Sequence, residues 1–177
     1  GCASSGSPAA STGNAGNPAG TTAKSTASRA TVVLAPASGS LVSGTLTLVP
    51  MGDGVHMTGE VGGLKPGDIR GFHIHEKGDC SAADASTAGG HFNPAAQAHG
   101  RSGQGAHHAG DTDNIVADAK GFPRINALVS GVTLGGGAAN DIAGRAVIVH
   151  AAADDYTTQP TGNAGARVAC GVIKVAP

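Results

Sequence analysis

Apolar and polar residues alternate over several short stretches of this 177-residue chain, and no stretch repeats its apolar residues at helical spacing. Clusters of Gly, Asn, Asp and Pro separate these stretches, as turns separate strands. The expected strands span residues 31–34, 41–49, 55–61, 69–75, 114–119, 122–129, 145–150 and 167–175, with a hairpin turn at Asp53-Gly54 after the second. Eight short strands with these turn signals predict an all-β, eight-stranded antiparallel sandwich or barrel.

Two segments, 77–112 and 151–166, show no period at all. A segment without periodic structure as long as the first is uncommon inside a compact domain, and such segments usually carry function. The first segment contains Cys80 and four of the eight histidines of the chain. We therefore expect two long functional loops on a framework of strands.

The N-terminal region differs in composition from the rest of the chain. Residues 1–28 consist mainly of Ser, Ala, Gly, Thr, Asn and Pro, which bury little apolar surface, so we expect a flexible linker followed by one domain at 29–177. Gly1-Cys2-Ala3 resembles the end of a bacterial lipoprotein signal, in which the cysteine carries the lipid. Lipidation of Cys2 would tether the protein to a membrane without spanning it, and the alternative is that Cys2 is an incidental cysteine.

Composition narrows the classes of function. Aromatic residues make up 2% of the chain and Trp is absent, so Val, Ile, Leu and Ala must fill the core. The 30 glycines indicate many turns rather than long helices. The net charge is −1 and 13% of the residues are charged, which argues against nucleic-acid binding, because that function needs a clustered basic surface. No apolar run has the length needed to span a bilayer.

The spacing of histidines is the strongest chemical signal in the sequence. Seven of the eight lie between positions 73 and 150. His73 and His75 are two residues apart on an expected strand, so both imidazoles face the same side. His150 ends another expected strand and can reach the same ion. Three or four imidazoles in a flattened arrangement suit Cu(II) better than other common ions.

A second ion is indicated by the long loop. His99, His108 and Asp111 supply two imidazoles and a carboxylate, and one more nitrogen would complete the closed four-ligand set that zinc prefers. His91 lies between the two groups in the sequence and is the natural bridging ligand, with one ring nitrogen for each ion. A bridging ring must lose both N–H protons, which two strong Lewis acids make reasonable near neutral pH.

Four segments resemble the signature segments of bacterial copper/zinc superoxide dismutases. They are Gly71–His75, Gly89–Pro94, His108–Asp111 and Gly162–Gly171, in this order along the chain. The resemblance covers about residues 29–177, which is everything except the expected linker. It implies that the eight strands form a Greek key and that the protein is an enzyme that converts superoxide to oxygen and hydrogen peroxide.

Carried over residue by residue, the resemblance implies the ligands of both metals. The copper ligands would be His73, His75, His91 and His150, and the zinc ligands would be His91, His99, His108 and Asp111. His107 is the alternative to His108, which we favour because it alone fits the pattern His-x-Gly-Asp. His56 lies away from every motif and is interpreted as an ordinary surface or core histidine.

The resemblance also implies roles for residues that do not bind metal. Asp154 would accept hydrogen bonds from one copper ligand and one zinc ligand, with Asp155 as the weaker candidate. Arg167 would dock superoxide, which is a small anion, or bind loop carbonyls, or do both. Cys80 and Cys170 would form an intrasubunit disulfide, in agreement with a location in the bacterial periplasm or envelope.

The implied reaction is a one-electron ping-pong cycle of copper in which Arg167 and His91 are the catalytic residues. Arg167 would dock each superoxide, and His91 would take a proton and pass it to the product. The 151–166 segment is poor in lysine, so Lys77 and Arg101 are candidates for the charges that steer superoxide.

We expect antioxidant defence in the bacterial envelope by a monomer or a homodimer. Three alternatives are a copper-carrying protein, an inert structural sandwich and a copper-only dismutase. The complete set of seven ligands disfavours the second and third, and the lack of a Cys-x-x-Cys or Cys-x-Cys motif disfavours the first.

Overall fold

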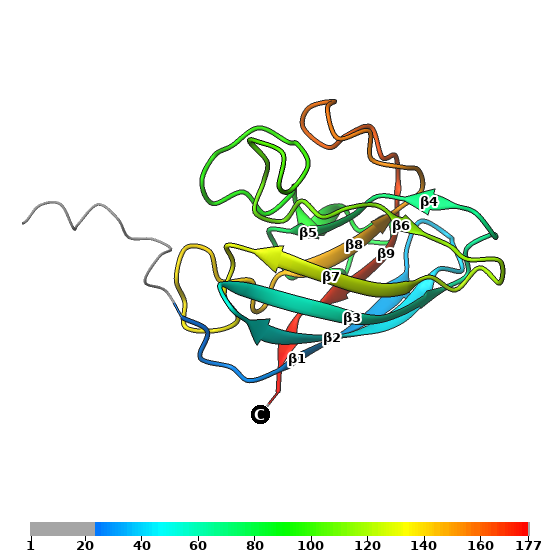
Figure 1. Cartoon of the computed structure of the whole chain (residues 1–177). Coiled ribbons are helices and arrows are strands. Elements are labelled where there is room, and N and C mark those ends of the chain that lie inside the picture. The colour runs from blue at the N-terminus through cyan, green and yellow to red at the C-terminus, as the bar shows by residue number, and fades with distance from the viewer. Residues whose placement is uncertain (1–23, 177) are drawn as a thin grey trace, which may run out of the picture.

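The computed structural model describes residues 24–176, and nearly all of its regular structure is β-strand (Figure 1). The strands, in chain order, are β1 (Ala30–Pro36), β2 (Ser43–Met51), β3 (Gly54–Gly62), β4 (Ile69–Arg70), β5 (Phe72–His75), β6 (Ile115–Val116), β7 (Arg124–Ser130), β8 (Ala146–His150), β9 (Arg167–Val172) and β10 (Lys174–Val175). One short 3₁₀ helix, η1 (Ser86–Ala88), lies between β5 and β6. The predicted all-β class is confirmed.

Eight strands form one curled antiparallel sheet in the order β5-β8-β9-β1-β2-β3-β7, with β10 beside β1, while β4 and β6 pair separately. The chain passes from β3 to β5 at the far edge of the sheet and returns to place β7 next to β3. These crossings give the Greek-key connection, so the predicted eight-stranded Greek-key architecture is confirmed. β1 joins the two halves because its first residues pair with β2 and its last residues pair with β9.

The core follows from the alternation of residues along the strands. In β1, Ala30, Val32 and Leu34 are buried, whereas Thr31 and Val33 face solvent. β8 is buried along its whole length, because it lies between β5 and β9 and is covered by loops. A strand with no solvent-facing position can hold a histidine away from water at its end.

Four local expectations were wrong. The stretches 69–75 and 167–175 are each two strands, interrupted at Gly71 and at Ile173, and 114–119 contains only the two-residue strand β6. The hairpin turn between β2 and β3 falls on Gly52-Asp53, one residue earlier than expected, because Met51 pairs with Gly54. The strands themselves lie within a few residues of the predicted positions.

The folded part begins before residue 29. The hydroxyl of Ser25 accepts a hydrogen bond from the Leu134 amide at 2.8 Å, and the amides of Thr26 and Ala27 donate to the Leu134 carbonyl at 3.1 and 3.0 Å. Residues 1–23, which include Cys2 and most of the expected linker, lie outside the described residues.

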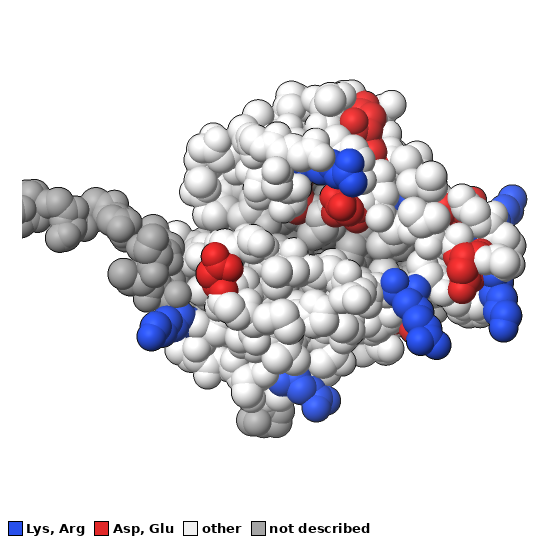
Figure 2. Space-filling model, in the orientation of Figure 1, with Lys and Arg blue, Asp and Glu red and all other residues white. Residues whose placement is uncertain are grey.

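The two long segments 77–112 and 151–166 form loops on the same side of the sheet, beside β5 and β8 (Figure 1). Charged side chains are few on the face seen in Figure 2, and acidic and basic ones are interspersed. Within residues 24–176, no helix is both long and apolar enough to cross a membrane.

Candidate metal centre

Four histidines converge where β5 and β8 meet the first long loop. His73 and His75 lie on β5, His150 ends the neighbouring strand β8, and His91 forms a β-bridge with His75. One ring nitrogen of each lies within 4.8 Å of the others, and all four side chains are buried. We call His73, His75, His91 and His150 the strand-side group.

The ring nitrogens of the strand-side group that face one another have no hydrogen-bond partner among the described residues. These atoms are Nδ1 of His73 and Nε2 of His75, His91 and His150. The opposite nitrogen is held elsewhere: Nδ1 of His75 donates to the Gly89 carbonyl at 2.9 Å, and Nδ1 of His150 donates to the Gly165 carbonyl at 3.2 Å. A proton fixed on one nitrogen leaves a lone pair on the other. Four buried lone pairs that converge without a partner fit a copper ion.

The charge state of these rings also fits metal binding. Burial lowers the pKa of His75 well below its ordinary value, and lowers the pKa of His91 to about 4 and of His150 to about 3. These rings are therefore neutral near pH 7, as imidazole ligands must be.

A second group lies within the first long loop and shares His91 with the first. Nδ1 of His91 lies 2.8 Å from Oδ1 of Asp111, and Nδ1 of His99 lies 2.9 Å from Oδ2. Nδ1 of His108 lies 3.3 Å from Oδ1 of the same carboxylate. We call His91, His99, His108 and Asp111 the loop-side group. Three imidazoles around one carboxylate, all buried, form the closed four-ligand set that fits zinc.

The carboxylate of Asp111 is held by the loop as well as by the histidines. Its Oδ2 accepts hydrogen bonds from the amides of Gly100 at 3.2 Å and His108 at 2.8 Å. Burial raises the pKa of Asp111, but the hydrogen bonds from His108 and His91 and from these amides lower it by more, so the carboxylate stays ionised. A negative charge thus remains among the rings of the loop-side group.

Asp154 connects the two groups. Its Oδ2 accepts a hydrogen bond from Nε2 of His73 at 2.7 Å, and its Oδ1 accepts one from Nε2 of His99 at 2.8 Å. Both rings are thereby fixed with Nδ1 free to act as a ligand. Asp155, by contrast, is exposed and bonds to the neighbouring Thr157 and Thr158.

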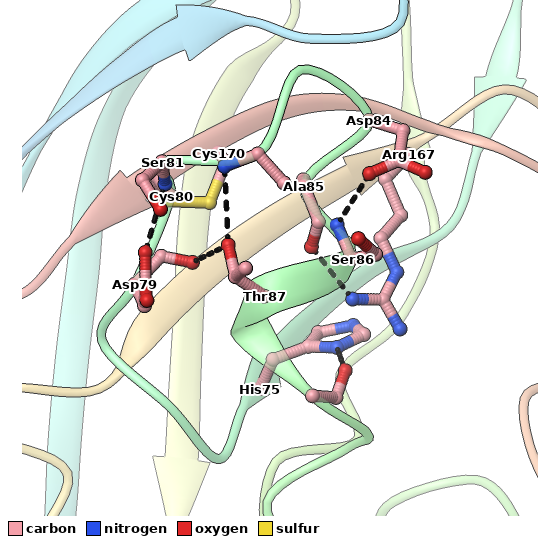
Figure 3. Close-up of a disulfide and its surroundings, with 12 residues drawn as sticks. His75, Asp79, Cys80, Ser81, Asp84, Ala85, Ser86, Thr87, Arg167 and Cys170 are labelled. Atoms are coloured by element: carbon pink, nitrogen blue, oxygen red, sulfur yellow. Dashed lines mark hydrogen bonds between the residues drawn. A yellow bond between two sulfur atoms is a disulfide. The ribbon is translucent and has the colours of Figure 1, made fainter.

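Arg167 lies at the start of β9, close to His75, and a disulfide holds the loop beside it (Figure 3). Its Nη1 donates to the carbonyl of Ala85 at 2.8 Å. Cys80 and Cys170 form the disulfide with an S–S distance of 2.04 Å, so that predicted pairing is confirmed. Burial lowers the pKa of Arg167, but a guanidinium remains charged at any physiological pH.

The structure places the other candidate residues outside both groups. His107 is half-buried, and its Nδ1 donates to the His108 carbonyl at 2.7 Å. His56 lies on β3, where its Nε2 is 2.5 Å from Oδ1 of Asn126. Arg101 pairs with Asp113 at 3.1 Å, so its charge is partly offset, whereas Lys77 is exposed.

Three residues near the site were missed in the sequence. Gln159 bonds to the main chain of His99, and Asn114 bonds to the main chain of Asp154. Gly162 packs against the hydrogen bond between the side chains of His99 and Asp154. Gly162 lies inside a recognised motif, which was a usable signal. The two amides face main-chain groups of irregular loops, and no residue pattern marks such a partner.

Comparison with known proteins agrees with this geometry. The family described as copper/zinc superoxide dismutase (SODC) matches residues 42–173. Superoxide dismutase [Cu-Zn] 2 of Aquifex aeolicus (strain VF5) is 41% identical over 136 residues, covering 75% of this chain and 80% of the relative. Superoxide dismutase [Cu-Zn] 1 of the same strain is 42% identical over 134 residues, covering 74% and 79%.

A SOD-like protein from Bacillus subtilis of known crystal structure has the same fold. It superposes with a TM-score of 0.73 at 37% identity, covering 81% of this chain and 97% of that one. The chain belongs to the copper/zinc superoxide dismutases, a family of oxidoreductases that bind copper and zinc.

Proposed function

We propose that this protein removes superoxide in the bacterial envelope, with copper held by the strand-side group and zinc by the loop-side group. Membership of the superoxide dismutase family supports the reaction itself. The ligand assignment rests on one observation above all, the four buried ring nitrogens that converge with no partner among the described residues.

Bound copper would supply a one-electron redox step, so that two superoxide anions and two protons yield one oxygen and one hydrogen peroxide. The chain's own residues bind the anion, keep water out and handle a proton. Arg167 is the docking residue, because its guanidinium is held by the Ala85 carbonyl beside His75 and presents a fixed positive charge (Figure 3).

His91 is the proton carrier. Its Nδ1 faces Asp111 in the loop-side group, while Nε2 faces the strand-side group and has no hydrogen-bond partner within residues 24–176. A proton at Nε2 would be the last N–H proton of the ring, and the positive charge of a metal at Nδ1 would make its release reasonable near neutral pH. Asp154 keeps the proton of His73 and the proton of His99 on Nε2 throughout, because its two oxygens accept both.

A superoxide-consumption assay with metal analysis on the same preparation tests this proposal. We expect Arg167→Ala to keep both metals and to lose activity by about 10- to 100-fold, because the anion is no longer oriented. Arg124→Ala is the matched control, since Arg124 is on the exposed side of β7 and pairs loosely with Glu60 at 3.7 Å. We expect His91→Ala to lose metal from both groups. Full activity of metal-loaded Arg167→Ala would contradict the docking role.

A metal-carrying protein on the same scaffold is the competing interpretation. It predicts stoichiometric copper and zinc without turnover in the same assay. The placement of Arg167 beside the strand-side group supports the enzyme, since a carrier has no use for an anion-docking residue there (Figure 3).

The location in the envelope is supported by the Cys80–Cys170 disulfide, because disulfides persist in oxidising compartments. The membrane tether rests on the sequence around Cys2. Fractionation of bacteria that produce the protein, with Cys2→Ala as the control, tests both: we expect envelope protein in each case and membrane attachment only with Cys2. Attachment of Cys2→Ala, or recovery with the cytosol, would contradict the proposal.

A further inference from the structure

A single side chain satisfies both main-chain polar groups of His99. The His99 amide donates to Oε1 of Gln159 at 2.7 Å, and the His99 carbonyl accepts from Nε2 of Gln159 at 2.9 Å. This is the pattern by which a neighbouring strand would bind one residue, here supplied by one amide from the other long loop. Nε2 of Gln159 also donates to the Thr157 carbonyl at 3.1 Å, which fixes the side chain.

Asp154 is held in the same way, by one amide side chain that bonds to both of its main-chain polar groups. Nδ2 of Asn114 donates to the Asp154 carbonyl at 2.9 Å, and the Asp154 amide donates to Oδ1 of Asn114 at 2.8 Å. His99 and Asp154 are the two residues whose side chains bond across the loops at 2.8 Å. The main chain of His99 is thus held by the side chain of Gln159, and the main chain of Asp154 by the side chain of Asn114.

His99 needs such support because its segment is irregular. It lies in the first long loop, where the described residues form no strand, whereas His73 and His75 are held by the ladder between β5 and β8. Its ring has to place Nδ1 at Asp111 and Nε2 at Asp154 at the same time. If Gln159 were removed, the two main-chain groups would have to turn toward water, and the ring would move with them.

We propose that Gln159 is a positioning residue for His99 and that it slows the loss of zinc from the loop-side group. The inference rests on the proposed zinc site. Gln159 is on the surface of the loop, so its replacement leaves the core and the strand-side group intact.

The test uses metal-loaded protein and follows the transfer of zinc to a chelator. We expect Gln159→Ala to release zinc on the order of 10-fold faster than the unaltered protein, as for other residues that orient a ligand. Gln159→Glu should fall in between, because a carboxylate still accepts from the His99 amide but opposes the His99 carbonyl. Gln97→Ala is the matched control: Gln97 is two residues from His99, exposed, and its amide donates to the Ala95 carbonyl at 3.4 Å. It should release zinc at the unaltered rate.

Three further readouts separate positioning from a general loss of structure. Cobalt bound in place of zinc should show an altered visible spectrum in Gln159→Ala, while the visible spectrum of copper and the thermal stability of the metal-free protein stay unchanged. Equal zinc release from Gln159→Ala and the unaltered protein would overturn the inference alone. Faster release of copper together with lower thermal stability would also overturn it. An unaltered protein that binds no zinc would overturn the proposed function and this inference together.

Discussion

The backbone at Gly162 lies directly against the hydrogen bond between Asp154 and His99. A methyl group at this residue would come within 1.8 Å of Oδ1 of Asp154 and 2.7 Å of Nε2 of His99, and the residue has a φ of +74°. The Gly162→Ala substitution therefore forces a backbone conformation that L residues avoid and pushes apart the hydrogen bond between the two loops. This clash acts directly on His99, a member of the loop-side group.

Gly165 allows the two effects to be separated. It lies three residues further along the same loop with a φ of +78°, but a methyl group there would meet no atom closer than 3.8 Å. Gly165→Ala should therefore cost about 1–2 kcal/mol from the left-handed conformation alone. Gly162→Ala should cost this amount and a further ~1–3 kcal/mol, because the buried carboxylate of Asp154 loses a charged hydrogen bond to His99.

The measurement is the free energy of unfolding of the metal-free protein in urea, together with zinc affinity by competition with a chelator. We expect Gly162→Ala to lower zinc affinity about 10- to 100-fold and Gly165→Ala to leave it within about twofold. If the two variants lose the same free energy of unfolding and bind zinc equally, the clash with Asp154 and His99 costs nothing, and the predicted difference between Gly162 and Gly165 is wrong.

Three further predictions follow from other contacts. Cys80→Ser should lower the free energy of unfolding by about 4–5 kcal/mol, since the disulfide spans 90 residues, and unfolding of oxidised and variant protein in urea measures this loss. Asp154→Asn should weaken metal binding about 10- to 100-fold in a chelator competition, because an NH2 group replaces one of the two accepting oxygens and cannot accept from its ring, and Asp155→Asn should not. In the metal-free protein, the pKa of His91 is about 4 and that of His150 is about 3, both below the ordinary 6.5, so the unfolded chain binds more protons than the folded one. The free energy of unfolding should therefore be full above about pH 6.5 and fall as the pH drops toward 4. Urea unfolding at about pH 7.5 and at about pH 5 measures this difference.

Alternation of residues was sufficient to predict the strands of the sheet because one face of most of them is buried. β1 buries Ala30, Val32 and Leu34 in strict alternation, and the pattern is legible without a structure. It failed at Gly71, where β4 and β5 separate although apolar residues continue on both sides. A methyl group at Gly71 would lie 2.9 Å from the side chain of Ala164, so a contact with the second long loop sets this break. Such a contact has no period in the sequence.

The members of the two groups of converging side chains were predictable for a different reason, namely residue chemistry combined with spacing. His73 and His75 share a face on any strand, and the loop ligands were assigned through motifs that resemble a known family. What the sequence could not supply is how the loop is held. Gln159 and Asn114 act on main-chain groups, which every residue has, so their partners are identifiable only in three dimensions.

The two groups of ligands are therefore supported by different kinds of structure, although His91 belongs to both. Three of the four strand-side histidines lie on β5 or at the end of β8, where the ladder of main-chain hydrogen bonds fixes them. The loop-side ligands lie in an irregular segment: isolated β-bridges tie His91 and Asp111 to β5, whereas His99 is held by the side chains of Gln159 and Asp154. A hydrogen-bond ladder tolerates the loss of one contact, but a loop held by single side chains does not. Sequence changes in the 151–166 loop should thus act first on His99, and only those that disturb Asp154 itself should reach the strand-side group.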